Sequence, residues 1–158
     1  MGSIKIITGV LIIIAIFYLA FFYSSSEQIS ENTMEYTGLF IGRRLTQYPM
    51  IAEVTEPGGN VYGIAAEEKL NFGRIPAGND IRKMLNLNND DDPVKIRVFA
   101  EGDIAPFILV SNNNFILEGE QEIEITFKSA DTGNFSGILN VEATTPMNWL
   151  GGWFLQWT

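Results

Sequence analysis

Residues 121–128 read QEIEITFK, and this stretch decides the fold because apolar and polar side chains alternate along it. Ile123, Ile125 and Phe127 would lie on one face of an extended chain, with polar residues between them on the other face. A period of two residues is typical of a β-strand that is buried on one face only. The stretch therefore predicts a strand in a sheet with one apolar face and one solvent-exposed face.

The same alternation recurs on either side of this stretch. Val94, Ile96 and Val98 alternate with two basic residues, and residues 135–141 repeat the pattern. Clusters of Asn, Asp, Gly, Pro and Ser separate the apolar runs, and these residues favour turns. This spacing predicts an all-β fold, an Ig-like antiparallel β-sandwich at residues 67–145. Its seven strands are expected at 69–73, 81–88, 93–100, 104–110, 114–117, 121–128 and 135–143.

A long apolar segment precedes the strands. Residues 6–23 read IITGVLIIIAIFYLAFFY without a charged side chain, and Ile4 extends the run beyond Lys5. A helix needs about 20 such residues to cross the hydrocarbon core of a bilayer, so we expect a single transmembrane α-helix at residues 4–23. No Lys or Arg follows the run before Arg43. The N-terminus is therefore expected in the cytoplasm, and the rest of the chain outside the cell membrane.

Two other interpretations of the apolar segment stay open. A secretory signal peptide usually has an apolar region of about 7–15 residues that ends at small residues, whereas this run ends in Phe21, Phe22 and Tyr23. A pilin-type signal cut near Gly9 would fit Lys5 and the aliphatic run, but no carboxylate follows early in the run. A retained anchor is the favoured interpretation.

Two segments lie between the anchor and the predicted sandwich. Residues 24–33 are rich in Ser, Glu and Asn and have nothing to bury, so they are expected to form a short polar stalk. Residues 34–66 mix apolar and polar positions and end near the turn signal Glu56–Asn60. Their pattern fits either a helix or a strand, and the segment is left as a connection of uncertain structure.

Composition excludes several classes of function. The chain of 158 residues contains no cysteine and no histidine. Disulfides, thiolate nucleophiles, Ser-His and Cys-His catalysis and most zinc sites are therefore excluded. The formal net charge is −9, and an acidic surface repels phosphate backbones, so nucleic acid is not an expected partner.

Two groups of acidic residues were considered as sites of chemistry. The turn at residues 88–92 offers oxygen ligands for Ca²⁺, but it lacks the spacing and the glycine of a Ca²⁺ loop. Glu122 and Glu124 share one face of a strand within reach of each other, as paired catalytic carboxylates would. Both groups are more readily explained as solvated surface. We predict no catalytic residue, no metal site and no cofactor.

The last ten residues contain all three tryptophans of the chain. Read as a strand, Trp149, Trp153 and Trp157 share one face with Leu155; read as a helix, they form a stripe with Leu150 and Phe154. A strand would close the domain's own sandwich or insert into a neighbour's sheet edge, whereas an amphipathic helix would lie at the membrane interface. The tail, residues 146–158, is therefore a predicted partner or membrane interface through Trp149, Leu150, Trp153, Phe154 and Trp157.

Three stretches resemble, in order, the Ig-like domains of the major-sperm-protein and abnormal-spindle/Hydin type. They are LNFGRIPAGNDIRKMLNLNN from Leu70, PVKIRV from Pro93 and GEQEIEITFKSADTGNFSGILNV from Gly119. The resemblance covers residues 69–143, about half of the chain. It implies an Ig-like fold, and it implies no particular function because such domains mediate many kinds of interaction.

These observations predict a non-enzymatic accessory or scaffold subunit of a membrane protein complex. Its partners would be the lipid bilayer and other membrane protein subunits or copies of itself. A pilin-like subunit of a surface filament and a stand-alone adhesion or ligand-binding module are the alternatives. The sequon Asn134-Phe135-Ser136 makes Asn134 a candidate N-glycosylation site on the extracytoplasmic side. The absence of cysteine, the sequon and the acidic surface suggest that the protein belongs to a prokaryotic cell envelope, such as that of an archaeon.

Overall fold

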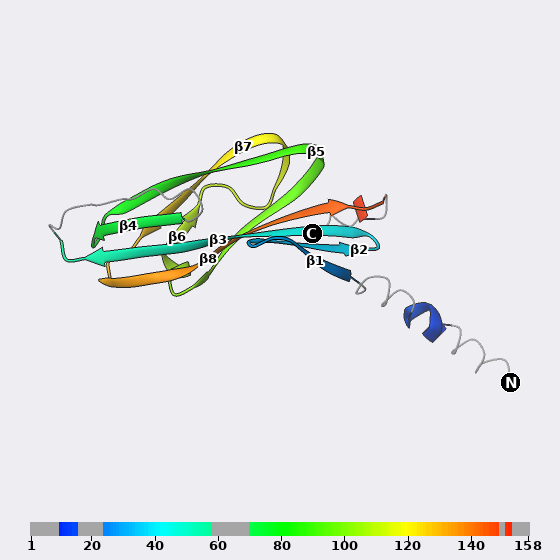
Figure 1. The fold of residues 1–158 in the computed structure, drawn as a ribbon, viewed down its shortest axis with the longest axis horizontal. Helices are drawn as coiled ribbons and strands as arrows, with labels where there is room; N and C mark the ends of the chain where they lie inside the picture. The colour runs from blue at the N-terminus through cyan, green and yellow to red at the C-terminus, as the bar shows by residue number, and fades with distance from the viewer. Residues whose placement is uncertain (1–9, 16–23, 58–69, 149–150, 153–158) are drawn as a thin grey trace. The chain divides into compact units, whose positions relative to one another are not determined.

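A computed structural model describes residues 10–15, 24–57, 70–148 and 151–152 of the chain (Figure 1). The chain divides into two compact units. The first, which we call the N-terminal unit, comprises residues 1–44 together with residues 144–158. The second, which we call the core unit, comprises residues 45–143.

Within the described residues eight strands form one sheet, and β3 and β8 each contribute residues to both units. The order of hydrogen-bonded neighbours is β1-β2-β3-β8-β5-β7-β6, and β4 pairs with β3 beside this path. A short 3₁₀ helix, η1 (Ala105–Phe107), precedes β6. The strands are β1 (Ser24–Ser30), β2 (Thr33–Gly38), β3 (Ile41–Thr55), β4 (Leu70–Pro76), β5 (Asp80–Gly102), β6 (Ile108–Val110), β7 (Phe115–Lys128) and β8 (Gly133–Pro146).

This architecture corrects the prediction of a seven-stranded antiparallel Ig-like sandwich. The part of the chain that the structure describes has eight strands in one open sheet, and β4 runs parallel to β3, with Met50 opposite Leu70 and Val54 opposite Ile75. Two pairs of predicted strands are single long strands, β5 and β7. The prediction broke each of them at a polar cluster that favours turns.

The polar cluster at residues 88–92 is a bulge inside β5. The pairing of β5 with β7 shifts register between Asn89 and Val94. The Asn89 side-chain amide donates to the main-chain carbonyl oxygens of Asp91 (3.3 Å), Asp92 (2.9 Å) and Leu117 (3.3 Å). These bonds satisfy backbone groups that the bulge removes from the ladder, so the strand continues where a turn was expected.

The core unit packs like a sandwich although its strands belong to one sheet. Three strands, β3, β8 and β5, separate β4 from β7 in the hydrogen-bonded order. In a flat sheet that separation would be about 19 Å, yet the ring centroids of Phe72 on β4 and Phe127 on β7 lie 5.5 Å apart. The sheet therefore curls until its apolar faces meet. Among the described residues, every buried apolar side chain lies between Met50 and Val141.

The predicted transmembrane helix at residues 4–23 is also corrected. Within that range the structure describes residues 10–15, which are helical, while 4–9 and 16–23 lie outside the described residues. None of the helices in the described ranges is both long enough and apolar enough to span a membrane.

Residues 24–33, interpreted above as a polar stalk, form β1 and the first residue of β2. Pairing is antiparallel from Ser24 opposite Gly38 to Ser30 opposite Thr33. The described side chains of β1 are all exposed, so neither apolar alternation nor burial could reveal this strand from sequence. The segment of uncertain structure above is residues 34–66; its residues 34–55 contain most of β2 and all of β3, and residues 58–66 lie outside the described residues.

Candidate functional site

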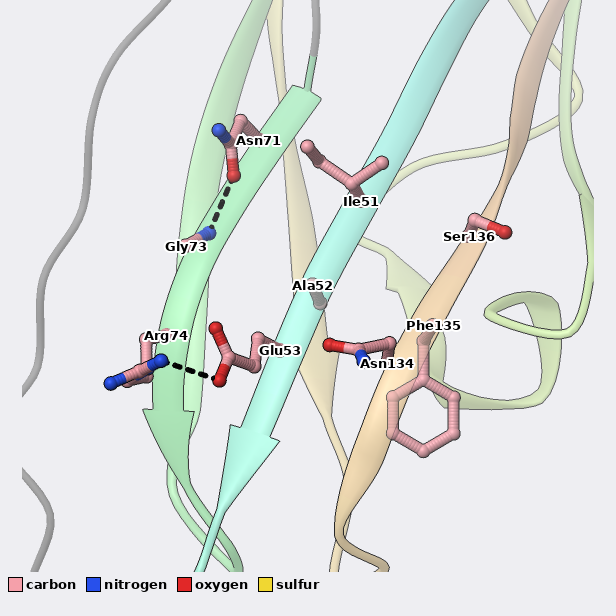
Figure 2. A pocket seen from close by; sticks show the side chains of 9 residues that line it. All are labelled: Ile51, Ala52, Glu53, Asn71, Gly73, Arg74, Asn134, Phe135 and Ser136. Carbon is pink, nitrogen blue, oxygen red and sulfur yellow. Dashed lines mark hydrogen bonds and ion pairs between the residues drawn. The ribbon is translucent and has the colours of Figure 1, made fainter.

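A shallow groove of about 500 Å³ lies on the outer face of β3, β4 and β8 in the core unit (Figure 2). Alternation along β3 creates its floor. Met50, Ala52 and Val54 are buried, so Ile51 and Glu53 point to the other side, and Ile51 is 45% exposed. The groove is thus the solvent face of the sheet that covers the core.

One rim of the groove is a salt bridge between neighbouring parallel strands. Glu53 of β3 and Arg74 of β4 are register partners, and Arg74 Nη2 lies 2.7 Å from Glu53 Oε1. Both side chains are about half exposed, so the pair contributes at most about 1 kcal/mol to stability. On β4, the Gly73 N–H donates to Asn71 Oδ1 (2.8 Å), which holds that amide beside the groove.

The other rim is the start of β8. Asn134 and Ser136 are exposed, while Phe135 between them points to the core side and packs against Phe107 with ring centroids 4.8 Å apart. Figure 2 shows the Asn134 amide extending from β8 toward β3. The Ser136 N–H donates to Asp103 Oδ1 (2.7 Å) and fixes the strand start.

The groove therefore combines hydrogen-bonding groups with one exposed apolar side chain. It offers the amides of Asn71 and Asn134, the Glu53–Arg74 pair and the Ile51 side chain, whereas the Ser136 hydroxyl donates to Asp103 Oδ1 (3.4 Å). Such a mixture suits a neutral polar ligand with one apolar face, since polar groups fix orientation and apolar contact adds area.

Of the two carboxylates given above as a possible catalytic pair, Glu124 takes part in surface contacts. Glu124 Oε2 lies 3.6 Å from Arg82 Nη1, and Glu124 Oε1 accepts from the Thr126 hydroxyl (3.3 Å). The same arginine lies 3.2 Å from Asp80 Oδ2. These two carboxylates raise the pKa of the exposed Arg82 guanidinium, with the hydrogen bond to Asp80 as the largest cause. In the part of the chain that the structure describes, no three acidic side chains converge on a point where a metal ion would sit.

Exposed apolar residues form a second candidate site, in the N-terminal unit. The side chains of residues 10–14, VLIII, are between 50% and 60% exposed on a helical turn. Ile29 of β1, Leu39 between β2 and β3, and Met147 after β8 are also more than half exposed. None of the described residues of this unit is a buried apolar residue.

The predicted interface in the tail lies outside the described residues: Trp149, Leu150, Trp153, Phe154 and Trp157. The residues just before and within it are described. Met147 N–H donates to Phe40 O (2.8 Å), and Asn148 links Leu39 O (2.9 Å) to the Gly151 N–H (3.0 Å). The start of the tail is therefore fixed to the turn between β2 and β3, within the N-terminal unit.

The sequence identified Asn134 as a candidate glycosylation site, but it did not identify the other residues that line the groove. Ile51, Glu53, Asn71 and Arg74 join the site only because β3 and β4 pair in parallel. A parallel pairing leaves no local signal, because its strands are joined through a distant connection rather than a tight turn. The alternation of buried and exposed positions along β3 was the one available sign that Ile51 and Glu53 face outward.

Comparisons with known proteins give no family for this chain. No protein-family model matches it, and neither the curated proteins nor the solved structures contain a significant match. The resemblance to Ig-like domains of the major-sperm-protein and abnormal-spindle/Hydin type therefore stays a prediction.

Proposed function

We propose that this chain is a non-enzymatic accessory or scaffold subunit of a membrane protein complex. Its apolar N-terminal run holds it at the membrane, and the core unit is displayed on the extracytoplasmic side. The observation that carries the proposal is the uneven distribution of exposed apolar surface between the two units.

The helical turn at residues 10–14 needs an apolar environment. Fully burying an aliphatic side chain is worth about 1.5–3 kcal/mol. Because these five side chains are about half exposed, covering them would contribute roughly 5 kcal/mol in total. A contiguous patch of this kind marks a site of contact with lipid or protein.

The core unit does not need an apolar environment in this way. Its buried apolar side chains come from five strands that pack on one another and from Ile104 before η1, and its outer faces carry ion pairs such as Arg74 with Glu53 and Arg82 with Asp80. This unit can therefore face water while the N-terminal unit contacts lipid and partner subunits. The net charge of −9 favours partners with cationic or apolar surfaces rather than nucleic acid.

The first experiment tests attachment to membranes. The full chain is expressed in its native host, and membranes are washed with alkaline carbonate. We expect the protein to remain in the pellet, and Leu11→Asp with Ile13→Asp to release it into the supernatant. The matched control is Met84→Ser with Leu109→Ser, two exposed apolar residues of the core unit that should leave retention unchanged. Equal retention of both double variants would contradict the proposed role of the apolar run.

The second experiment tests the accessory role. The intact protein is extracted in mild detergent, and native mass spectrometry identifies what accompanies it. We expect a fixed set of different membrane proteins, which Trp153→Ser with Trp157→Ser should remove while leaving Asn148 and Gly151 in place. Recovery of the chain alone, or only with copies of itself, would favour an adhesion module or a filament subunit instead.

A further inference from the structure

We propose that Asn134 carries an N-linked glycan whose first sugar lies in the groove between β3, β4 and β8. The inference rests on the proposed extracytoplasmic location, because glycan donors act on that side of the membrane. In the linking step, Asn134 Nδ2 loses a proton and bonds to the anomeric carbon of the sugar. The bond from that carbon to the phosphate of a lipid-linked oligosaccharide donor breaks, and the phosphate leaves with the bonding electrons.

The strand geometry presents the sequon in an accessible form. Because side chains alternate along β8, Asn134 and Ser136 share the outer face while Phe135 is held on the core side by Phe107. Asn134 is exposed, and its amide makes no hydrogen bond to any residue within the described ranges. Attachment of a sugar would therefore break no contact that holds the fold.

The groove is suited to the first sugar of such a glycan. Its volume of about 500 Å³ lies in the range of about 300–1,000 Å³ that small-molecule sites occupy. A sugar ring has an apolar C–H face and hydroxyls at its edge. Ile51, which is 45% exposed, would meet the apolar face, and Glu53 on the same strand and Asn71 on β4 would receive the hydroxyls.

A glycosylation assay tests the acceptor. The full chain is produced in a eukaryotic secretory host, and intact mass reports the number of glycans. We expect one glycan on the unaltered chain and on Ser136→Thr, and none on Asn134→Gln. Asp90→Thr is a positive control, because it turns the exposed Asn88-Asn89-Asp90 into a second sequon in the same unit, and it should give two glycans.

The control separates two kinds of failure. If Asp90→Thr gains a single glycan at Asn88 and Asn134 gains none, the inference is overturned while the proposed location stands. If neither site is modified, both the inference and the location are overturned.

Thermal unfolding tests whether the first sugar lies in the groove. Trimming the glycan to its first sugar should keep Tm several degrees above that of Asn134→Gln, because the sugar covers Ile51. In an Ile51→Thr background that difference should shrink to near zero, since the two changes would be coupled through one contact. An equal Tm difference in both backgrounds would show that the sugar does not lie against Ile51, and would overturn the assignment of the groove.

Discussion

Gly137 lies where two segments of the core unit approach each other closely. A Cβ built at this position would overlap the Glu101 carbonyl oxygen and lie 2.6 Å from Ile104 Cγ2. We expect Gly137→Ala to lower the free energy of unfolding by about 1–3 kcal/mol, as overpacking of a core does. Urea denaturation measures the change. Gly152→Ala is the matched control, because the nearest atom to its new Cβ is 3.9 Å away, and an equal loss there would contradict this explanation.

Tyr48 should make stability depend on alkaline pH. Burial raises the pKa of its phenol above the ordinary value of 10.0, so between the unfolded and folded pKa values the folded state binds more protons. The slope of unfolding free energy with pH is then negative. The contribution is complete below about pH 10 and is lost as pH rises through the folded pKa.

The measurement is urea denaturation at several pH values from about 8 to about 11, the range in which phenols titrate. Tyr48→Phe should flatten the decline above about pH 10 relative to the unaltered protein. If both proteins lose stability in parallel over that range, Tyr48 is not the cause of the pH dependence.

At the scale of elements, contact between β4 and β7 holds the curled sheet closed. Phe127 is fully buried and lies near Phe72 (5.5 Å), Phe107 (6.2 Å) and Phe135 (5.9 Å) between ring centroids. We expect Phe127→Ala to lower the free energy of unfolding by about 3–5 kcal/mol. Chemical denaturation measures this change. Phe99, partly buried under Arg97 at 5.2 Å, is the control. Phe99→Ala should lower the free energy of unfolding clearly less than Phe127→Ala does. Similar losses at both positions would mean that contact between β4 and β7 does not explain the loss at Phe127.

At the scale of the whole molecule, the proposed function predicts that the core unit provides stability and the N-terminal unit provides attachment. Every buried apolar residue that the structure describes lies within residues 50–141, so a chain lacking residues 1–23 should keep its urea midpoint. Recovery in the membrane fraction should fall to background at the same time. A large drop in the midpoint would show that the apolar run also supports the fold, contrary to this division.

Much of the fold follows from local pattern. The alternation of Ile123, Ile125 and Phe127 and that of Val94, Ile96 and Val98 correctly predicted which side chains are buried. The sequence identified Asn134 as a candidate glycosylation site, and the structure places this residue at an exposed position. These features are encoded by neighbours in the chain, because a strand with one buried face imposes a period of two on its own residues.

Only the tertiary structure decided which predicted strands form one continuous strand and which strands pair with each other. The Asn89 amide bridges a polar cluster that reads as a turn, so β5 runs on through it. Pairing of β3 with β4 in parallel brings Ile51 and Arg74 to one groove with Asn134. The pairing of β3 with β4 and the bond from Asn89 to Leu117 join residues far apart in sequence, and local periodicity carries no information about such partners.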